Sequence, residues 1–307
     1  MTDKKKRYSY EQSLKSLDTE EFIDLKFYRP IGYLWALFFE RIGVTPNVVS
    51  ILSIFLGVGA GVMFYFNNLD LNIIGMLLLI WANTYDSADG QLARMTGNYS
   101  RMGRILDGAC GDIWFITIYA AICLRLTPQW GIYIWLLAAF AGFWHSKQAS
   151  MADYYRNIHL FFLKGKSGSE LDDAAKVKKE FQHISFMKEP VYKVFMWFYS
   201  GYTAKQEKLT PAMQCFRKLL RERYGEEAVP ASLREDFRKQ SKPLMKYTNM
   251  LSFNTRVIAL FISLFLDKPW LYFVFELVVL NGMLIYMVTK HERICRNFCE
   301  RLTGKKK

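Results

Sequence analysis

The apolar residues of this 307-residue chain collect in long blocks separated by charged stretches. Hydrophobic residues make up 51% of the sequence. Several blocks reach the roughly 20 apolar residues that a helix needs to span the hydrocarbon core of a bilayer. No block alternates like a strand, and no segment repeats. These features predict an all-α integral membrane protein.

Six blocks are predicted to be transmembrane helices, since turn-forming residues bound most of them. They cover about residues 48–66, 71–95, 103–126, 130 to near His145, 247–266 and 270–289. Thr45 and Pro46 suit the N-cap and first position of a helix, so the first span is expected to begin there. The aromatic-rich segment 30–42 is too short to span and predicts an N-terminal interfacial helix.

The distribution of basic residues predicts how the chain is oriented in the membrane. Connections expected on the outer side contain one lysine, Lys268, whereas the segments expected inside are rich in Lys and Arg. Positive charge favours the cytoplasmic side, so both termini are predicted to be cytoplasmic. We expect a bacterial inner membrane. The net charge of +13 is then expected to contact anionic membrane lipids, with no nucleic acid as a partner.

The alternation of apolar blocks and charged stretches divides the chain into five predicted segments. They are a cytosolic N-terminal segment (1–29), the interfacial helix with spans one to four (30–163), a cytosolic or interfacial helical insertion (164–245), spans five and six (246–290) and a basic cytosolic tail (291–307). Within the insertion, residues 172–181 and 211–224 are predicted to be amphipathic helices. Nothing in its sequence specifies a role for the insertion.

Three acidic residues lie near the cytosolic ends of predicted spans two and three. Asp86 and Asp89 are three residues apart and share a helix face, and Asp107 lies in the second turn of the next, antiparallel span. The three carboxylates are therefore expected at one depth, where they would repel one another. One or two divalent cations would remove that repulsion, and oxygen ligands favour Mg²⁺, Mn²⁺ or Ca²⁺.

The residues around these acids point to a phosphate ligand. Gly90 permits close approach to the backbone, Ala93 keeps the helix face narrow, and Arg94 offers a planar fork suited to phosphate. Acids, metal and arginine together predict a pyrophosphate site. The alternative from another class is a buried ion network in a divalent-ion or proton-coupled transporter, which would need neither Gly90 nor Arg94.

The run from Asp86 to Asp112 resembles the signature of the CDP-alcohol phosphotransferase family, D-x-x-D-G-x-x-A-R-x8-G-x3-D-x3-D. The matching positions are Asp86, Asp89, Gly90, Ala93, Arg94, Gly103 and Asp107. The tetrapeptide from Thr45 to Val48 is also common in that family. The resemblance covers about residues 30–158, reaches spans five and six by topology alone and leaves 164–245 outside.

The resemblance implies an enzyme in which an acceptor hydroxyl attacks the phosphorus beyond the cytidylate of a CDP-linked donor, and CMP leaves. It implies that Asp86, Asp89 and Asp107 hold two ions, Mg²⁺ or Mn²⁺. The CDP moiety would then be bound by Gly90, Ala93, Arg94 and Gly103. Family members are often dimers, so a homodimer is an expectation.

The chain departs from the signature at the fourth acid, which is the proposed general base. The signature places it at position 111, where this chain has Gly111, and the next residue is Asp112. On a regular helix, Asp112 lies about 100° further round. We hypothesise that a one-residue π-bulge, eased by Gly108 and Gly111, returns Asp112 to the expected face. Alternatively another group supplies the base, or the protein binds CDP without turnover.

Polar residues in spans three to five form a candidate acceptor pocket. They are Arg104, His145, Gln148, Asp153, Arg156 and Arg256. The arginines suit a second phosphate, as in family members that use inositol phosphate, whereas a solvated helix end explains the span-four residues equally well.

Two donor–acceptor combinations stay open for a product that is a phospholipid or related polar lipid. CDP-diacylglycerol would transfer to a soluble alcohol, with a preference for inositol-type acceptors. Alternatively, a CDP-linked headgroup would transfer to a lipid acceptor such as diacylglycerol or ceramide.

The five cysteines show no C-x-x-C spacing and are expected to be reduced thiols. Cys295 and Cys299 lie one helical turn apart. His291 is nearby, but without a second histidine it is not enough to predict a zinc site.

Overall fold

The computed structural model describes residues 8–14, 16–98, 101–165, 169, 171–225 and 228–304. Across these residues every regular element is a helix, which confirms the predicted all-α class. The helices form two compact units. The first unit comprises Met1–Phe143 with Val257–Phe275, and the second comprises Trp144–Arg256 with Glu276–Lys307. The five-segment division stays a prediction.

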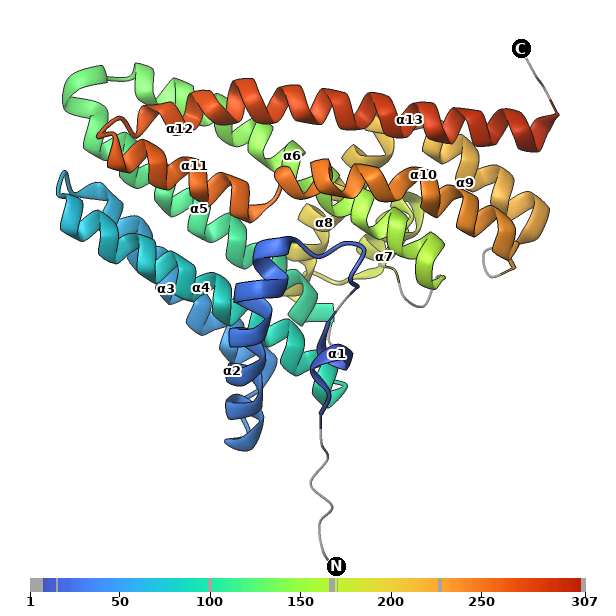
Figure 1. Ribbon diagram of the computed structural model, residues 1–307, viewed down its shortest axis with the longest axis horizontal. Coiled ribbons are helices and arrows are strands. Elements are labelled where there is room, and N and C mark those ends of the chain that lie inside the picture. Colours follow the sequence, from blue (N-terminus) through green and yellow to red (C-terminus); the bar gives the residue numbers. More distant parts are fainter. Residues whose placement is uncertain are drawn as a thin grey trace, which may run out of the picture. The chain divides into compact units, whose positions relative to one another are not determined.

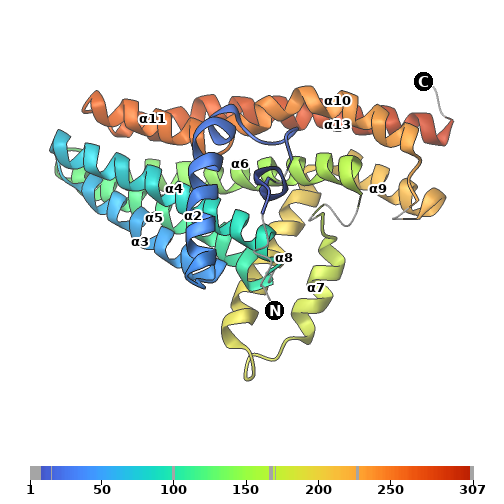
Figure 2. The same ribbon diagram turned by 60° about the horizontal axis from the view of Figure 1, so that its bottom comes forward.

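The first unit is built around α3 (Pro46–Tyr65), which packs along α4 (Leu69–Thr96) and α5 (Arg101–Trp130). Figures 1 and 2 show α3 and α4 side by side. Two glycines of α3 allow α5 to approach, because a Cβ atom at Gly57 would lie 2.0 Å from the Trp114 ring and one at Gly61 would lie 2.7 Å from Thr117. Small residues at such contacts let apolar helices pack backbone to backbone.

The predicted start of α3 is confirmed, because the helix begins at Pro46 with Thr45 in the N-cap position. The Thr45 side chain makes no capping hydrogen bond. The feature that favours a helix start here is therefore Pro46, whose fixed φ suits the first helical position.

The N-terminal elements pack against the polar half of α4. They are α1 (Tyr10–Ser13), the π-helical turn η1 (Asp24–Tyr28) and α2 (Arg29–Arg41). A Cβ atom at Gly32 of α2 would lie 2.6 Å from Oε1 of Gln91 in α4, and Gln91 donates a hydrogen bond to the Arg29 carbonyl (3.1 Å). Segment 30–42 is therefore helical as predicted, and its interfacial position stays a prediction.

The second unit contains the helices of the predicted insertion. They are α7 (Ala174–His183), α8 (Pro190–Leu209), α9 (Pro211–Tyr224) and α10 (Ala231–Met250). Figure 2 shows α7 beside α8. The predicted helix 211–224 is confirmed, and α7 begins two residues later than predicted because Asp173 caps it by accepting from Ala175 and Lys176 N–H groups.

Aromatic side chains form the core of the second unit, where α9 and α10 pack against α13 (Asn281–Thr303). The rings of Phe162 and Phe237 stack with centroids 3.9 Å apart. Phe298 of α13 lies 5.4 Å from the rings of both Phe216 and Phe237. Burial of these rings holds the insertion helices against the C-terminal helix.

The last predicted span is helical but is not a uniform α-helix. It begins as α12 (Trp270–Phe275), passes through a π-helical turn, η3 (Glu276–Leu280), and continues as α13. π-Helical turns are rare and often mark functional positions. This turn brings one buried acid, Glu276, into the second unit.

Four of the described helical segments are long and apolar enough to cross a membrane, as expected for an integral membrane protein. They are Pro46–Tyr65, Leu106–Trp130, Ala231–Phe265 and Trp270–Thr303. The helix α4 and the helix α6 (Tyr133–Lys164) are also long, but polar residues such as Asp86 and Gln148 lower their mean hydropathy. Six spans therefore stay a prediction for this chain.

Candidate active site

Two neighbouring helices of the first unit bring three carboxylates together. Asp86 and Asp89 lie one turn apart on α4, and Asp107 lies on α5. Each contributes one oxygen to a group in which all three atoms lie within 4.8 Å of one another. Asp89 is buried, Asp86 is half-buried and Asp107 is exposed. The cluster therefore extends from the helix interface to the protein surface.

The hydroxyl of Ser50 holds the buried carboxylate in place. Ser50 of α3 donates to Oδ2 of Asp89, and the Cys110 thiol donates to the Ser50 carbonyl (3.5 Å). Helices α3, α4 and α5 thus meet at this acid. The sequence analysis did not identify Ser50 as a site residue. A signal existed, because a serine one turn after Pro46 in an apolar helix needs a hydrogen-bond partner when it is buried.

The Arg94 side chain lies over Gly90. A Cβ atom at Gly90 would lie 3.4 Å from Nη1 and 3.6 Å from Nη2 of Arg94. The Arg94 Nε donates to the backbone carbonyl of Ser13 in α1, so the N-terminal helix helps to orient the guanidinium. Ala93 and Gly103, the other residues predicted to bind CDP, are half-buried on α4 and α5.

The donor set of the acidic cluster fits a divalent cation. All three groups are carboxylates, which are hard oxygen ligands of the kind that Mg²⁺ and Mn²⁺ prefer. Their oxygens are close enough to share an ion, and three negative charges in one cluster repel one another unless a cation compensates them.

The predicted π-bulge next to Asp112 is wrong. Helix α5 runs as a regular α-helix from Arg101 to Trp130, so Asp112 does not return to the face of Asp107. Nothing lies within 4 Å of a Cβ atom built on Gly108 or on Gly111, so no packing contact forces an extra residue into the turn. Asp112 itself is exposed.

Three of the predicted acceptor residues converge in the second unit, around an acid that the sequence analysis missed. Arg256 donates from Nη1 to Oε1 of Glu276 (2.5 Å) and from Nη2 to Oε1 of Gln148 (2.9 Å). His145 Nδ1 lies 2.9 Å from the same Glu276 oxygen, and Gln148 donates to Asn281 (2.7 Å). Arg256 and Glu276 are at most 1% exposed.

A sequence signal for Glu276 existed. It is the one charged residue in the apolar block 270–289, and an ionisable residue inside such a block usually has a partner or a function.

The remaining predicted acceptor residues have other partners. Arg156 donates to Asn249 (3.2 Å) and to Ser252, whereas Asp153 accepts from Asn157 (3.1 Å) and from Tyr202 (3.2 Å). The side chain of Arg104 lies outside the described residues. His145, Gln148 and Arg256 therefore share one hydrogen-bond network, whereas Arg156 and Asp153 each bond to other residues.

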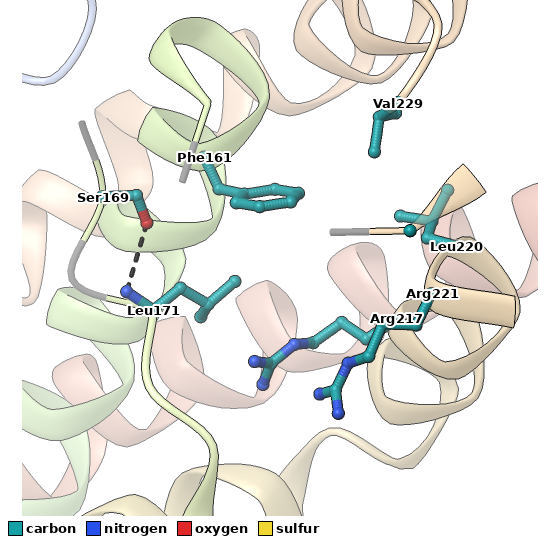
Figure 3. A pocket seen from close by; sticks show the side chains of 8 residues that line it. Phe161, Ser169, Leu171, Arg217, Leu220, Arg221 and Val229 are labelled. Carbon is teal, nitrogen blue, oxygen red and sulfur yellow. Dashed lines mark hydrogen bonds between the residues drawn. The ribbon is translucent and has the colours of Figure 1, made fainter. Parts of the chain in front are cut away.

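A pocket in the second unit contains none of these predicted residues (Figure 3). It is lined by Phe161, Ser169, Leu171, Arg217, Leu220, Arg221, Gly225 and Val229. Both arginines pair with acids: Arg221 with Asp173 (2.7 Å) and Arg217 with Glu207 (3.6 Å). The pocket is therefore a poor candidate for the phosphate chemistry that the acidic cluster indicates.

Comparison with known proteins assigns the region around the acidic cluster to a family. Residues 43–158 match the family described as CDP-alcohol phosphatidyltransferase, and this segment contains the whole run from Asp86 to Asp112. These residues form a CDP-alcohol phosphatidyltransferase domain. The resemblance seen in the signature is thereby confirmed.

Two curated relatives match part of the chain. The "Bifunctional IPC transferase and DIPP synthase" of Aquifex aeolicus is 25% identical over 140 residues, which are 46% of this chain and 29% of the relative. The "Archaetidylinositol phosphate synthase" of Pyrococcus horikoshii is 30% identical over 91 residues, 30% of this chain and 47% of the relative. The chain thus spans less than half the length of each. No solved structure matches the chain.

Proposed function

We propose that this protein transfers a substituted phosphoryl group from a CDP-linked donor to an acceptor hydroxyl, as a step in the synthesis of a phospholipid or related polar lipid. The acceptor oxygen forms a bond to the phosphorus beyond the cytidylate, the bond from that phosphorus to the bridging oxygen breaks, and CMP leaves with the electron pair. The observation that supports this most is the group formed by Asp86, Asp89 and Asp107, next to Arg94, within a domain of this family.

The acidic cluster would hold the divalent cations, Mg²⁺ or Mn²⁺, and two ions are proposed. Such ions, when bound, would neutralise charge on the pyrophosphate and on the leaving CMP. Ser50 would keep the Asp89 carboxylate in one orientation through its hydrogen bond. Exposure of Asp107 leaves this side of the cluster open to a substrate.

Arg94 is proposed to bind the phosphates of the donor. Its guanidinium has a planar fork that suits phosphate oxygens, and Gly90 leaves room for it above the helix. Ala93 and Gly103 have small side chains or none, so they would leave room on the helix surfaces for the cytidine moiety.

Asp112 is proposed as the general base that accepts the proton of the acceptor hydroxyl. It is the acid that follows Asp107 on α5, and it is exposed. The regular helix places it about 140° round from Asp107, since each residue turns an α-helix by 100°. This role requires the acceptor hydroxyl to lie on the exposed face of α5 that carries Asp112, away from the face of Asp107. Full activity in an Asp112→Asn variant would overturn this role.

The proposed donor and acceptor rest on the names of the relatives and on the residues of the motif. The name of one relative includes an inositol phosphate product, which supports CDP-diacylglycerol or a similar CDP-lipid as donor and an inositol-type alcohol as acceptor. In the second arrangement, a CDP-linked headgroup transfers to diacylglycerol or ceramide.

The membrane topology is also a proposal. Six spans with both termini cytoplasmic, in a bacterial inner membrane, would place the acidic cluster at the cytoplasmic side, where CDP-linked donors and Mg²⁺ are available. The basic segments would contact anionic lipids, and the protein would act as a homodimer.

The proposal is tested with purified protein in detergent or vesicles, supplied with Mg²⁺ or Mn²⁺ and a panel of CDP-linked donors and acceptor alcohols. We expect CMP release that needs both substrates, with the active pair identifying the arrangement. An Asp107→Asn variant should lose activity. The matched control is Asp70→Asn, an exposed acid in the first turn of α4, which should retain it. Absence of CMP release across all donors would overturn the proposal.

A further inference from the structure

A second cluster of metal-binding side chains lies in the other unit, where α13 packs against α9. His291, Glu292 and Cys295 each offer one ligand atom, and these atoms all lie within 4.8 Å of one another. All three residues are buried: His291 and Cys295 are 0% exposed and Glu292 is 8% exposed. The cluster follows the apolar block of the last helix, in a stretch that also contains Lys290, Arg293 and Arg296.

The spacing of the ligands on α13 explains why they meet. His291 and Cys295 are four residues apart and face the same side of the helix. Nδ1 of His291 lies 3.5 Å from Sγ of Cys295. Two ligands of one tetrahedral zinc ion, with bonds of about 2.1 Å to nitrogen and about 2.3 Å to sulfur, lie about 3.6 Å apart. The observed separation fits shared coordination of one ion.

The neighbouring helix orients the third ligand. The two carboxylate oxygens of Glu292 accept from the backbone N–H groups of Ala212 (2.6 Å) and Met213 (3.2 Å) in the first turn of α9. A carboxylate has lone pairs beyond those that these two bonds use, so it can still bind an ion. Such support from neighbouring groups is what metal sites use to orient their ligands.

Two further contacts define the surroundings of the cluster. The thioether sulfur of Met213 lies 3.5 Å from Sγ of Cys295. The His291 ring lies against Tyr155, with centroids 4.3 Å apart, which fixes the plane of the imidazole. Nitrogen, thiolate and a single carboxylate favour zinc over Mg²⁺ or Ca²⁺, which take oxygen ligands.

We propose that His291, Glu292 and Cys295 bind a Zn²⁺ ion, with water or the Met213 thioether as the fourth ligand. The ion is structural: it fixes α13 to the start of α9 in the second unit and takes no part in phosphoryl transfer. This site is separate from the acidic cluster of the first unit and is independent of the proposed activity.

The first test uses the wild-type protein, purified without chelator and washed with excess Mg²⁺ to occupy hard oxygen sites. We expect one retained Zn²⁺ per chain by elemental analysis. Replacement of that ion by Co²⁺ should give the thiolate-to-metal charge-transfer absorption of a cysteine ligand. A chain that retains no zinc, or a Co²⁺ form without this absorption, would overturn the proposal.

Variants then assign the ligands. Cys295→Ala should abolish the charge-transfer absorption, while Cys123→Ser, which changes a buried cysteine of the first unit, should preserve it. Glu292→Gln keeps the size of the side chain and an acceptor for α9. We expect it to weaken zinc binding, measured by chelator competition, by at least the roughly 10- to 100-fold that loss of an outer-shell partner costs. Unchanged absorption in Cys295→Ala would refute the assignment.

Discussion

Two groups of charged side chains in the part of the chain that the structure describes differ in the signs of charge that they bring together. The acidic cluster of the first unit gathers Asp86, Asp89 and Asp107, which are all negative. The group in the second unit pairs Arg256 with Glu276 at 2.5 Å, and His145 contacts the same carboxylate. Asp89 in the first group and both partners of the ion pair in the second are buried, where desolvation makes a lone charge costly.

This difference in the signs of charge indicates which group can bind a cation. In the second unit the protein supplies both signs of charge, and the amide of Gln148 takes a further hydrogen bond from Arg256. Such a group holds helices in one arrangement. In the first unit three carboxylates converge, with Arg29 and Arg94 nearby, and their oxygens are the ligands that a divalent cation prefers. We infer that the cluster of three carboxylates is the reactive group and that the Arg256–Glu276 pair is structural, and the predictions below test that contrast.

The largest effect is expected for Asp89→Asn. This change removes a buried carboxylate from the acidic cluster and leaves Ser50 with a neutral acceptor. CMP release should fall at least a thousandfold, which corresponds to about 4 kcal/mol in the activation barrier. Because the change also removes like-charge repulsion, the Tm without metal should not fall. The matched variant Asp70→Asn should change neither value.

Glu276→Gln should have the opposite profile. It leaves the Arg256 guanidinium buried without its countercharge, and breaking such a pair typically costs about 3–5 kcal/mol of stability. We expect a large fall in Tm and little change in CMP release per folded molecule. A double variant, Glu276→Gln with Arg256→Met, should recover much of the loss. A Glu276→Gln variant as stable as wild type would contradict the structural role of the Arg256–Glu276 pair.

Gly90→Ala should have an intermediate effect, mainly on the KM for the CDP-linked donor. The added methyl group would lie 3.4 Å from Nη1 of Arg94, in van der Waals contact, so it would fill part of the space beside the guanidinium that a donor phosphate would use. We expect the KM for the CDP-linked donor to rise about tenfold, which corresponds to about 1.4 kcal/mol, with a smaller change in kcat. Gly108→Ala is the control, because nothing lies within 4 Å of its added methyl group.

The smallest effect is expected at the cap of α7. Burial alone would raise the pKa of Asp173, but hydrogen bonds from Arg221 and from the N–H groups of Lys176 and Ala175 outweigh it and lower the pKa below its ordinary value. The resulting stability is present above the pKa of the unfolded chain and is lost as pH falls through the lower pKa of the folded chain. Wild type should exceed Asp173→Asn by about 0.5 kcal/mol near neutral pH. Thermal melts at pH 7 and near pH 3 measure this, and a gap that widened with acid would contradict the sign.

The site in the first unit could be predicted because its residues lie close together in sequence. Asp86 and Asp89 share a helix face by spacing, and Asp107 lies near the start of the next antiparallel helix. Partners distant in sequence were not predictable in this way. Ser50 reaches Asp89 only because α3 packs against α4, and Arg94 meets Ser13 only because α1 folds back onto α4.

The π-bulge hypothesis shows the same limit. A π-bulge was expected in α5, where Gly108 and Gly111 made it easy, and the helix there is regular. A π-helical turn instead occurs at Glu276–Leu280, where the acid that meets Arg256 begins the turn. Flexible residues permit a bulge, whereas a buried polar partner can favour one, and the partner is not visible in local sequence.

The second metal cluster extends this point. No zinc site was predicted at His291 and Cys295 because no second histidine is nearby in the sequence. The orientation of Glu292 by α9, some 80 residues earlier in the chain, is visible only in the fold.

The most direct test of the central contrast is the dependence of CMP release on divalent metal. Protein freed of metal by chelator should release no CMP from a CDP-linked donor, and added Mg²⁺ or Mn²⁺ should restore release in wild type and Asp70→Asn but not in Asp107→Asn. Release that persists without metal, or that Asp107→Asn retains in full, would contradict the assignment of the acidic cluster as the reactive site.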